Sequence, residues 1–427
     1  MVHLPDGKVV RTIKGLRWYI AGLLCLSTAL NYLDRQTLAL LAATLEREVG
    51  ITTIQYSYVI TAFLTSYTIM YAVSGRLIDY LGTRRGFSLF VSLWSVGDLL
   101  HAFARTALQF LFCRVLLGAV EPANFPAGAK AVSEWFPMRE RALAVGIFNS
   151  GTAIGACAAA PLVAWITLHL GWRYTFVAGA GLSAAWVVLW LLVYRLPREH
   201  PRLSAMELSL IEDGAAPPVP RSAVPLRRIL AIREVWGCIL VRMLMDPISY
   251  FCIFWMPKFL QQERGFDLGA IGRYYWIPWV AAAAGNLTGG AVPRYLNRRG
   301  WSINRARKTI MLTASLGLWA CFMLITRVPS PGLSVALISL ALFCTQNFCF
   351  MALPAEAVPE RIVGAVTGFG GAMGSLVGAV TMLVIGRIVR VSSFAPIFLV
   401  YAVFPLLAFG VVCILIRKLG EPREIPA

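Results

Sequence analysis

Charged side chains are scarce in this sequence. Asp, Glu, Lys and Arg make up 14% of its 427 residues, whereas 58% of the residues are hydrophobic. A water-soluble domain usually carries about 25% charged residues. The composition therefore excludes a chain that folds mainly in water, and it indicates a protein whose surface faces lipid.

Histidine, paired cysteines and catalytic motifs are equally scarce. The nine cysteines are scattered without CxxC or histidine-paired spacing. The four histidines (His3, His101, His169 and His200) fall at expected helix ends and loops, which favours neither a metal cluster nor a histidine proton relay. Because HExxH, GxSxG and Walker patterns are also missing, we expect no enzyme activity, no metal and no organic cofactor.

Long apolar stretches fill most of the chain. A bilayer core of ~30 Å requires roughly 20 apolar residues per helix. Such stretches occur near residues 18–41, 54–78, 87–104, 108–131, 142–168, 172–194, 235–260, 270–292, 310–325, 333–353, 362–388 and 394–416. The sequence predicts an all-α polytopic membrane protein with twelve transmembrane helices. The first stretch is too long for a signal peptide.

The basic residues are distributed unevenly between the loops. Of 39 Lys and Arg residues, roughly 27 fall in loops on the side of both termini and roughly 9 on the other side, an asymmetry that orients membrane proteins. We expect a multi-pass protein of the cell inner membrane with both termini in the cytoplasm. This placement also explains the net charge of +18 without a nucleic-acid partner.

The spans divide into two similar sets of six. A polar, proline-bearing stretch at 197–233 separates an expected bundle at 1–196 from one at 234–427. Residues 75–85 and 289–300 form similar glycine turns followed by two arginines, each after the second span of its half. Two repeated six-helix halves with a substrate site between them near the midplane are a known transporter arrangement.

Four charged residues fall inside apolar spans. Asp34 and Arg35 lie midway through the first span, and Arg114 and Glu121 lie in the fourth. Arg114 and Glu121 are seven residues apart, so they share a helix face about 10 Å apart, with Gly118 leaving an open notch between them. Intramembrane charges usually face a cavity and mark a substrate or ion pathway. The alternative is an ion pair that only braces helices.

The four charges suggest distinct roles. Arg35 is the candidate to bind a substrate carboxylate, because its planar fork accepts two oxygens at once. Arg114 would hold Glu121 or Asp34 in one conformation and release it in another. Burial and a nearby arginine shift the protonation of a carboxylate in opposite directions. We therefore expect Asp34 and Glu121 to carry protons as the coupling ion.

Three stretches resemble one family of transporters. Residues 75–85 (Gly-Arg-Leu-Ile-Asp-Tyr-Leu-Gly-Thr-Arg-Arg) look like the signature loop of the major facilitator superfamily, with Tyr80 where a basic residue is usual. Residues 31–36 (Asn-Tyr-Leu-Asp-Arg-Gln) and 114–126 resemble its anion:cation symporter family, especially hexuronate and sugar-acid transporters. The resemblance implies proton-coupled uptake of a sugar acid, such as a hexuronate or an aldonate, by a monomer with alternating access.

The resemblance also implies further site residues. The substrate-binding residues that it adds are Tyr67, Asn149, Thr152, Tyr250 and Ser375, while depth in the membrane alone suggests Tyr32, Gln346 and Asn347. Each of these is as often a residue that joins helices as a ligand. In the resembling family, Asp79, Arg84 and Arg85 form a charged latch that closes the cytoplasmic side in one state.

Other charges and alternatives remain. Arg242 and Asp246, four apart in the seventh span, are expected to pair with one another, and a gating role for them stays open. Asp98 in the third span is either a departure special to this chain or the partner of an uncounted charge. The competing functions are antiport or export of other carboxylates and, more distantly, a polytopic membrane enzyme.

Overall fold

The computed structural model describes residues 2–3, 9–10, 12–212 and 225–420. Within these ranges the chain is almost entirely helical. A short antiparallel ladder between β1 (Val2–His3) and β2 (Val9–Val10) precedes the first helix. The all-α fold predicted from the sequence is confirmed.

The helices of the first half are numbered α1 to α8. In chain order they are α1 (Leu16–Leu40), α2 (Ala42–Glu48), α3 (Thr53–Leu81), α4 (Thr83–Phe103), α5 (Ala107–Val120), the 3-10 turn η1 (Glu121–Ala123), α6 (Asn124–Trp135), α7 (Met138–Leu170) and α8 (Arg173–Val193). Three short pieces follow: η2 (Pro197–Glu199), α9 (Ala205–Glu212) and α10 (Leu226–Leu230). Residues 213–224 of the expected linker, including Pro217, Pro218 and Pro220, lie outside the described residues.

The helices of the second half are numbered α11 to α19. They are α11 (Arg233–Phe254), α12 (Met256–Glu263), α13 (Leu268–Tyr274), α14 (Ile277–Arg298), α15 (Ile303–Ile325), α16 (Pro331–Asn347), α17 (Leu353–Ala357), α18 (Glu360–Val391) and α19 (Ala395–Leu415). The order of long and short helices differs between the halves, but each half contains six of the apolar stretches predicted from the sequence.

Seven helices of the described residues are each long and apolar enough to cross a membrane: α4, α7, α8, α11, α15, α18 and α19. The other five predicted spans fall on α1 and α3, which carry charged residues, and on the broken pairs α5–α6, α13–α14 and α16–α17. The twelve-span fold predicted from the sequence is therefore confirmed. Three of its spans are interrupted.

Local sequence explains where several helices begin and end. Thr52 starts α3 with a capping box, in which its side chain accepts from the backbone of Gln55 while the Gln55 side chain accepts from the backbone of Thr52. Gly82 (φ 75°) separates α3 from α4, and Gly171 (φ 98°) separates α7 from α8. Positive φ costs little for glycine, so the chain reverses there between antiparallel helices.

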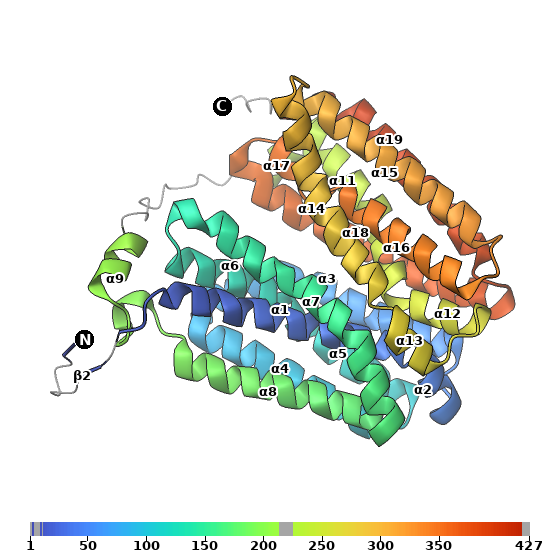
Figure 1. Ribbon diagram of the computed structural model, residues 1–427, viewed down its shortest axis with the longest axis horizontal. Coiled ribbons are helices and arrows are strands. Elements are labelled where there is room, and N and C mark those ends of the chain that lie inside the picture. Colours follow the sequence, from blue (N-terminus) through green and yellow to red (C-terminus); the bar gives the residue numbers. More distant parts are fainter. Residues whose placement is uncertain (1, 4–8, 11, 213–224, 421–427) are drawn as a thin grey trace.

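The helices of each half pack mainly on one another. In the first half α1 packs on α7, α3 on α5 and α4 on α8, and in the second half α14 packs on α16 and α15 on α19. The halves meet where α3 packs on α18 and where α7 packs on α13 and α14. Figure 1 shows the blue-to-green first half beside the yellow-to-red second half. The buried apolar core runs through both.

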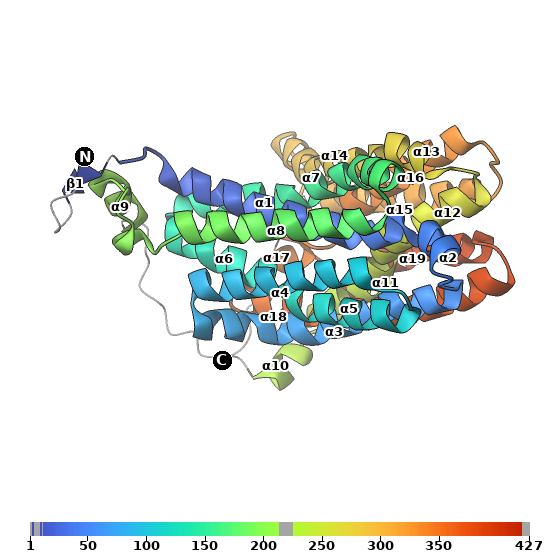
Figure 2. The same ribbon diagram turned by 90° about the horizontal axis from the view of Figure 1, so that it is seen from below.

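The bundle has two distinct ends. We call the end that holds α9 and the first turn of α1 the terminal end, and the end that holds α2 and α12 the far end; Figure 2 shows them on opposite sides of the molecule. At the terminal end, the Glu207 carboxylate accepts hydrogen bonds from the backbone nitrogens of Gly15, Leu16 and Arg17. The linker therefore caps the first helix of the first half.

The two halves are joined by polar contacts at the far end. Lys258 of α12 forms an ion pair with Glu46 of α2 at 2.9 Å and donates to Thr53 Oγ1 at 2.8 Å. The Tyr56 hydroxyl donates to the Phe254 carbonyl at 2.7 Å. In Figure 1 the two sets of helices converge toward this end. The structure is therefore closed at the far end.

At the terminal end, ion pairs form within each half. Lys130 pairs with Asp79 in the first half, and Arg307 pairs with Glu356 in the second. These charges neutralise partners of their own half, so they do not tie the halves together as Lys258 does at the far end. This difference between the two ends defines the conformation of the molecule.

The close approach of α1 and α7 depends on glycine, so we expect a larger residue at this contact to destabilise the protein. A Cβ at Gly155 would lie 2.0 Å from the Ala29 carbonyl oxygen, whereas one at Gly146 on the same helix meets nothing within 4 Å. Gly155→Ala must push α7 away from α1, and such overpacking typically costs about 1–3 kcal/mol. We expect a clear drop in the thermal unfolding temperature in detergent for Gly155→Ala.

Gly146→Ala is the matched control, because it makes the same chemical change on α7 without a neighbour to displace. It should unfold at or slightly above the parent temperature, since alanine favours a helix over glycine. Equal stability of the two variants would show that the close approach of α1 and α7 does not hold the first half together.

Candidate functional site

Five ionisable side chains gather in the interior of the first half. They are Asp34 and Arg35 of α1, Asp98 of α4, Arg114 of α5 and Glu121 at the start of η1, and each is at most 5% exposed. Four of them are the intramembrane charges singled out in the sequence. We call this group the charged cluster.

The central contact of the cluster joins Arg35 to Glu121. Arg35 Nη2 lies 3.0 Å from Glu121 Oε2 and 3.3 Å from Asn31 Oδ1. The guanidinium also lies over the rings of Tyr32 and Tyr67, at 5.0 and 4.9 Å from their centroids. Arg35 is therefore held by one carboxylate and by aromatic faces, which attract a cation.

The expected ion pair between Arg114 and an acid is not formed. Two helical turns, about 10 Å, separate Arg114 from Glu121, and its guanidinium lies over the Phe63 ring at 5.7 Å. Its three nitrogens have no hydrogen-bond acceptor among the described residues. In this conformation Glu121, one of the two partners expected for Arg114, is bound to Arg35.

The open notch expected at Gly118 is also wrong. A Cβ at Gly118 would lie 2.4 Å from the Phe63 carbonyl oxygen and 2.1 Å from Ser66 Oγ. The missing side chain therefore admits the backbone of α3 and leaves no space for a ligand. Close packing of small residues is a usual feature of membrane helix pairs, and here it seals Arg114 from solvent at 1% exposure.

Asp98 also belongs to the charged cluster, although its position in the sequence indicated no partner for it. The carboxyl groups of Asp34 and Asp98 approach one another across Gly179 of α8: a Cβ there would lie 2.9 Å from Asp34 Oδ1 and 3.6 Å from Asp98 Oδ2. The sequence signal was the charge itself within an apolar third span. Its neighbour could not be read from the sequence, because α1 and α4 are more than 40 residues apart.

A layer of tyrosines extends from the cluster toward the second half. We call Tyr32, Tyr67, Tyr71 and Tyr250 the tyrosine layer. The rings of Tyr67 and Tyr71 stack at 6.0 Å, and the Tyr250 hydroxyl lies 2.7 Å from Ser375 Oγ, which joins α11 to α18. Three of the tyrosines and Ser375 were predicted site residues, whereas Tyr71 was missed.

A second buried ion pair lies on the other side of this layer. Arg242 Nε is 2.7 Å from Asp246 Oδ2, so the predicted pairing within α11 is confirmed. A Cβ at Gly371 would lie 3.3 Å from Arg242 Nη2 and 3.9 Å from Tyr71 Cε1. Arg242 of the second half and Tyr71 of the first therefore meet at the boundary between the halves.

The remaining predicted ligands are placed differently from one another. On α7, Asn149 is exposed, and the Thr152 hydroxyl donates to the Asn149 carbonyl. On α16, Gln346 is partly buried, and Asn347 Nδ2 donates to Thr288 Oγ1 of α14 at 3.0 Å. Asn347 therefore joins two helices in this conformation.

Both halves break their fourth span. In the first half η1 interrupts the span at Glu121–Ala123. In the second half α16 ends at Asn347 and α17 begins at Leu353, with Cys349 between them at φ 54°. Discontinuous helices at the midplane are where transporters place substrate and ion sites.

The predicted latch at the terminal end has a different partner. Asp79 pairs with Lys130 of α6 at 2.9 Å, and Arg84 Nη2 donates to the Leu191 carbonyl of α8 at 2.6 Å. Arg84 and Arg85 lie in the first turn of α4, after the turn that ends α3. The sequence interpretation missed Lys130, which lies some 50 residues away from Asp79.

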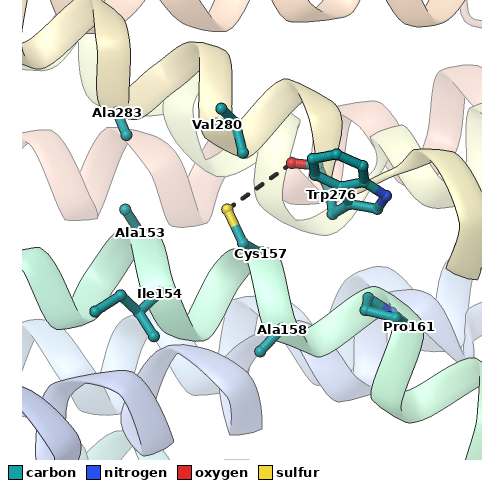
Figure 3. A pocket seen from close by; sticks show the side chains of 8 residues that line it. All are labelled: Ala153, Ile154, Cys157, Ala158, Pro161, Trp276, Val280 and Ala283. Carbon is teal, nitrogen blue, oxygen red and sulfur yellow. Dashed lines mark hydrogen bonds between the residues drawn. The ribbon is translucent and has the colours of Figure 1, made fainter.

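A cleft elsewhere between the halves has no charged lining. It measures about 570 Å³ and lies between α7 and α14, where Cys157 and Trp276 face one another among small apolar side chains (Figure 3). The Cys157 thiol lies 3.8 Å from the Trp276 carbonyl oxygen. This lining offers an anion no cation, so the charged cluster and the tyrosine layer form the candidate site.

Two repeated helical halves, broken fourth spans and a buried charged cluster define a polytopic membrane transport protein. Residues 24–382 match the family model described as Major Facilitator Superfamily. The chain belongs to this superfamily, which is one of transporters and not of enzymes.

Curated relatives support this membership along nearly the whole chain. The hexuronate transporter of Escherichia coli (strain K12) is 35% identical over 404 residues, covering 93% of both chains. A galacturonate transporter of Dickeya chrysanthemi is 38% identical over 66% of this chain and 82% of its own. A D-galactonate transporter of Escherichia coli O6:H1 is 30% identical, covering 89% and 91%.

Solved structures support the same fold. The crystal structure of a bacterial homolog to the human lysosomal transporter Spinster, inward-facing and unoccupied, has a TM-score of 0.74 at 18% identity and covers 97% of this chain and 100% of that one. A D-xylose-proton symporter also has a TM-score of 0.74, at 13% identity, covering 95% and 99%. At these identities the likeness concerns the fold alone.

The geometry predicts that Arg35 and Glu121 depend on each other. Arg35→Ala would leave the Glu121 carboxylate buried without a cation, and breaking a buried pair this way costs about 3–5 kcal/mol. Adding Glu121→Gln removes the unpaired charge and should restore part of the loss. A double-mutant cycle of thermal unfolding measures this coupling; additive losses would mean that the 3.0 Å contact contributes no stability.

Proposed function

We propose that the protein takes up a sugar acid, such as a hexuronate or an aldonate, together with a proton. The names of the relatives, at 30–38% identity, support a sugar acid as the solute. The single observation that supports proton coupling is the buried 3.0 Å ion pair between Arg35 and Glu121. The Arg35 guanidinium is a cation that an anionic substrate can bind. The Glu121 carboxylate must release this guanidinium before the substrate binds it.

Competition for Arg35 couples the substrate to the proton. One planar guanidinium binds one carboxylate in bidentate fashion, so a substrate carboxylate has to displace Glu121. A displaced, buried Glu121 carboxylate without a cation is costly, and protonation removes the cost. The substrate therefore binds more tightly when Glu121 is protonated, and by linkage the proton binds more tightly when the substrate is present.

We expect the tyrosine layer and neighbouring polar side chains to form hydrogen bonds with the hydroxyl groups of the solute. Tyr32, Tyr67 and Tyr250 present phenol groups at the boundary of the halves, and Ser375 lies against Tyr250. Asn149, Thr152, Gln346 and Asn347 add amide and hydroxyl groups from α7 and α16. Such a set of donors and acceptors suits a polyhydroxylated molecule better than an apolar acid.

Arg114 would act in another conformation. In this one it is sealed behind α3 and α5 without an acceptor. We propose that Arg114 takes over Asp34, or Glu121 once it has released its proton, because a buried guanidinium without an acceptor is costly. Asp34 is the second proton carrier of the cluster.

The charge asymmetry supports one orientation of the bundle in the membrane. The terminal end carries most of the basic residues, which favours a cytoplasmic location for this end and for both termini in an inner membrane. With this orientation, closure of the far end by Lys258 and Glu46 corresponds to an inward-facing state. Rocking of 1–196 against 234–427, joined by 197–233, would open the far end. A monomer contains both halves and suffices for this cycle.

Closure of the terminal end would use the charges already placed there. Asp79 is bound by Lys130 within the first half, and Arg84 and Arg85 are exposed at the start of α4. We propose that these residues exchange partners with the second half when the terminal end closes. No new charge is then needed to latch the outward-facing state.

Electrical energetics favour the proton. Bringing a monoanion into a negative cell interior opposes about 2.3 kcal/mol per 100 mV, and one accompanying proton cancels this cost. Two protons would turn the membrane potential into a driving force. Uptake of the anion together with at least one proton is therefore energetically favoured over uptake of the anion alone.

The substrate assignment predicts ligand-dependent stability. Galacturonate, glucuronate or galactonate should raise the unfolding temperature of the purified protein, whereas the uncharged parent sugars should not. Arg35→Lys keeps a charge for Glu121 but loses the planar fork, so its affinity should fall about tenfold, or about 1.4 kcal/mol. Arg198→Lys, on the exposed linker, is the control. Failure of every sugar acid to stabilise the parent would refute the assignment.

The coupling mechanism predicts a selective loss. In Glu121→Gln vesicles, uptake of the stabilising sugar acid should no longer respond to an imposed pH gradient, because glutamine cannot exchange a proton. Counterflow of labelled for unlabelled substrate should persist, since Arg35 is then free. Glu212→Gln, at the exposed end of α9, should behave as the parent. A preserved response in Glu121→Gln would remove Glu121 from the proton path.

A further inference from the structure

Asp34 and Asp98 form a carboxyl pair that the mechanism above uses only in part. Both are buried, at 3% and 1% exposure, on α1 and α4. Measured from a Cβ at Gly179, Asp34 Oδ1 lies at 2.9 Å and Asp98 Oδ2 at 3.6 Å, so these oxygens are no further apart than the sum of the two distances. The two carboxyl groups therefore face one another across Gly179.

The pair lacks hydrogen-bond donors. Both oxygens of Asp98 and Oδ2 of Asp34 are buried without a partner among the described residues. Neither aspartate has a Lys or Arg nitrogen within ion-pair distance in the described part of the chain. Buried carboxylates normally accept several hydrogen bonds or pair with a cation. A proton held between the two groups would supply the missing donor.

The ionisable groups around the pair do not supply that donor either. Arg114 of α5 and Glu121 of η1 belong to the same buried cluster, but Glu121 is bound to Arg35 and the Arg114 nitrogens have no acceptor among the described residues. His101, one turn along α4, uses Nδ1 on the Gly97 carbonyl. The acidic and basic residues of α3, α7 and α8 lie near the ends of those helices, and Lys130 of α6 is bound to Asp79.

The charges of the cluster point to the number of protons. Three carboxylates (Asp34, Asp98 and Glu121) against two guanidiniums (Arg35 and Arg114) leave one negative charge uncompensated in a buried site. An uncompensated charge in low dielectric is strongly disfavoured. Two carboxyl groups at close range also resist joint ionisation and share a proton instead. One bound proton makes the cluster neutral.

We propose that Asp34 and Asp98 hold one proton between them in this conformation, which adds Asp98 to Glu121 and Asp34 as a third protonation residue of the transporter. The proton comes from water and returns to water, and its loss leaves two carboxylates. Arg114, with three unsatisfied nitrogens in the same cluster, is the cation that would then turn toward them. The transport role of the pair rests on the proposed function, but its proton occupancy does not.

Infrared spectroscopy of the reconstituted full-length protein tests the occupancy. The parent at neutral pH should show the carbonyl-stretch band of a buried protonated carboxylic acid, which shifts on exchange into heavy water. Asp34→Asn and Asp98→Asn should each abolish this band, because either change leaves one carboxylate that balances the two arginines together with Glu121. The double variant should show no further loss.

Asp246→Asn is the matched control, since Asp246 is a buried acid already paired with Arg242 at 2.7 Å. This variant should keep the band. A full band in Asp98→Asn overturns the proposal, as does a parent without a band at neutral pH. The parent measurement needs no variant, so the proposal stays testable even where an asparagine variant fails to fold.

Transport separates this inference from the proposed function. Asp98→Asn vesicles should keep counterflow but accumulate less sugar acid under a pH gradient than the parent. If parent uptake ignores the pH gradient while the band behaves as expected, proton symport is wrong and the shared proton stands. If the parent responds and Asp98→Asn responds equally, Asp98 has no part in coupling.

Discussion

One buried guanidinium with two possible anionic partners organises this protein. Arg35 lies 5% exposed at the centre of the first half, where it cannot remain unpaired. In this conformation Glu121 neutralises it at 3.0 Å. The surrounding helices position the two partners of this contact. Helix α1 lies against glycines of α7, and Glu121 lies at the start of η1. Under the proposed function, a carboxylate solute binds Arg35 by replacing Glu121.

The two halves contribute differently to the candidate site. The first half holds the charged cluster, which gathers five ionisable groups from α1, α4, α5 and η1. The second half brings one ion pair, Arg242 with Asp246, to the edge of the tyrosine layer. Both halves interrupt their fourth span, yet only the first places an acid at the break. The charged groups of the candidate site are therefore concentrated in the first half.

Much of the fold could be predicted from the sequence, because a membrane constrains it strongly. Each span must satisfy its backbone hydrogen bonds internally, so twelve apolar stretches imply twelve helical spans. The pairing of Arg242 with Asp246 was predictable because both lie on one helix, four residues apart. Spacing within a helix is a local property.

Contacts between helices could not be predicted in this way. Glu121 or Asp34 was expected to pair with Arg114 in one conformation, but in this one Arg35 binds Glu121 and the Arg114 nitrogens have no acceptor among the described residues. The partner of Asp79 in this conformation is Lys130 of α6, a contact between helices that the sequence did not indicate. The notch at Gly118 is filled by the backbone of α3.

The sequence by itself determined that the chain spans a membrane, that it repeats six spans, and that charges in those spans mark a candidate site. Because burying a charge in hydrocarbon is costly, charged residues inside apolar spans are rare and easily recognised in a sequence. Only the tertiary structure decided which charges meet, that Asp98 stands beside Asp34, and which end of the bundle is closed. These depend on distances of a few ångströms between segments far apart in the chain, which local patterns do not encode.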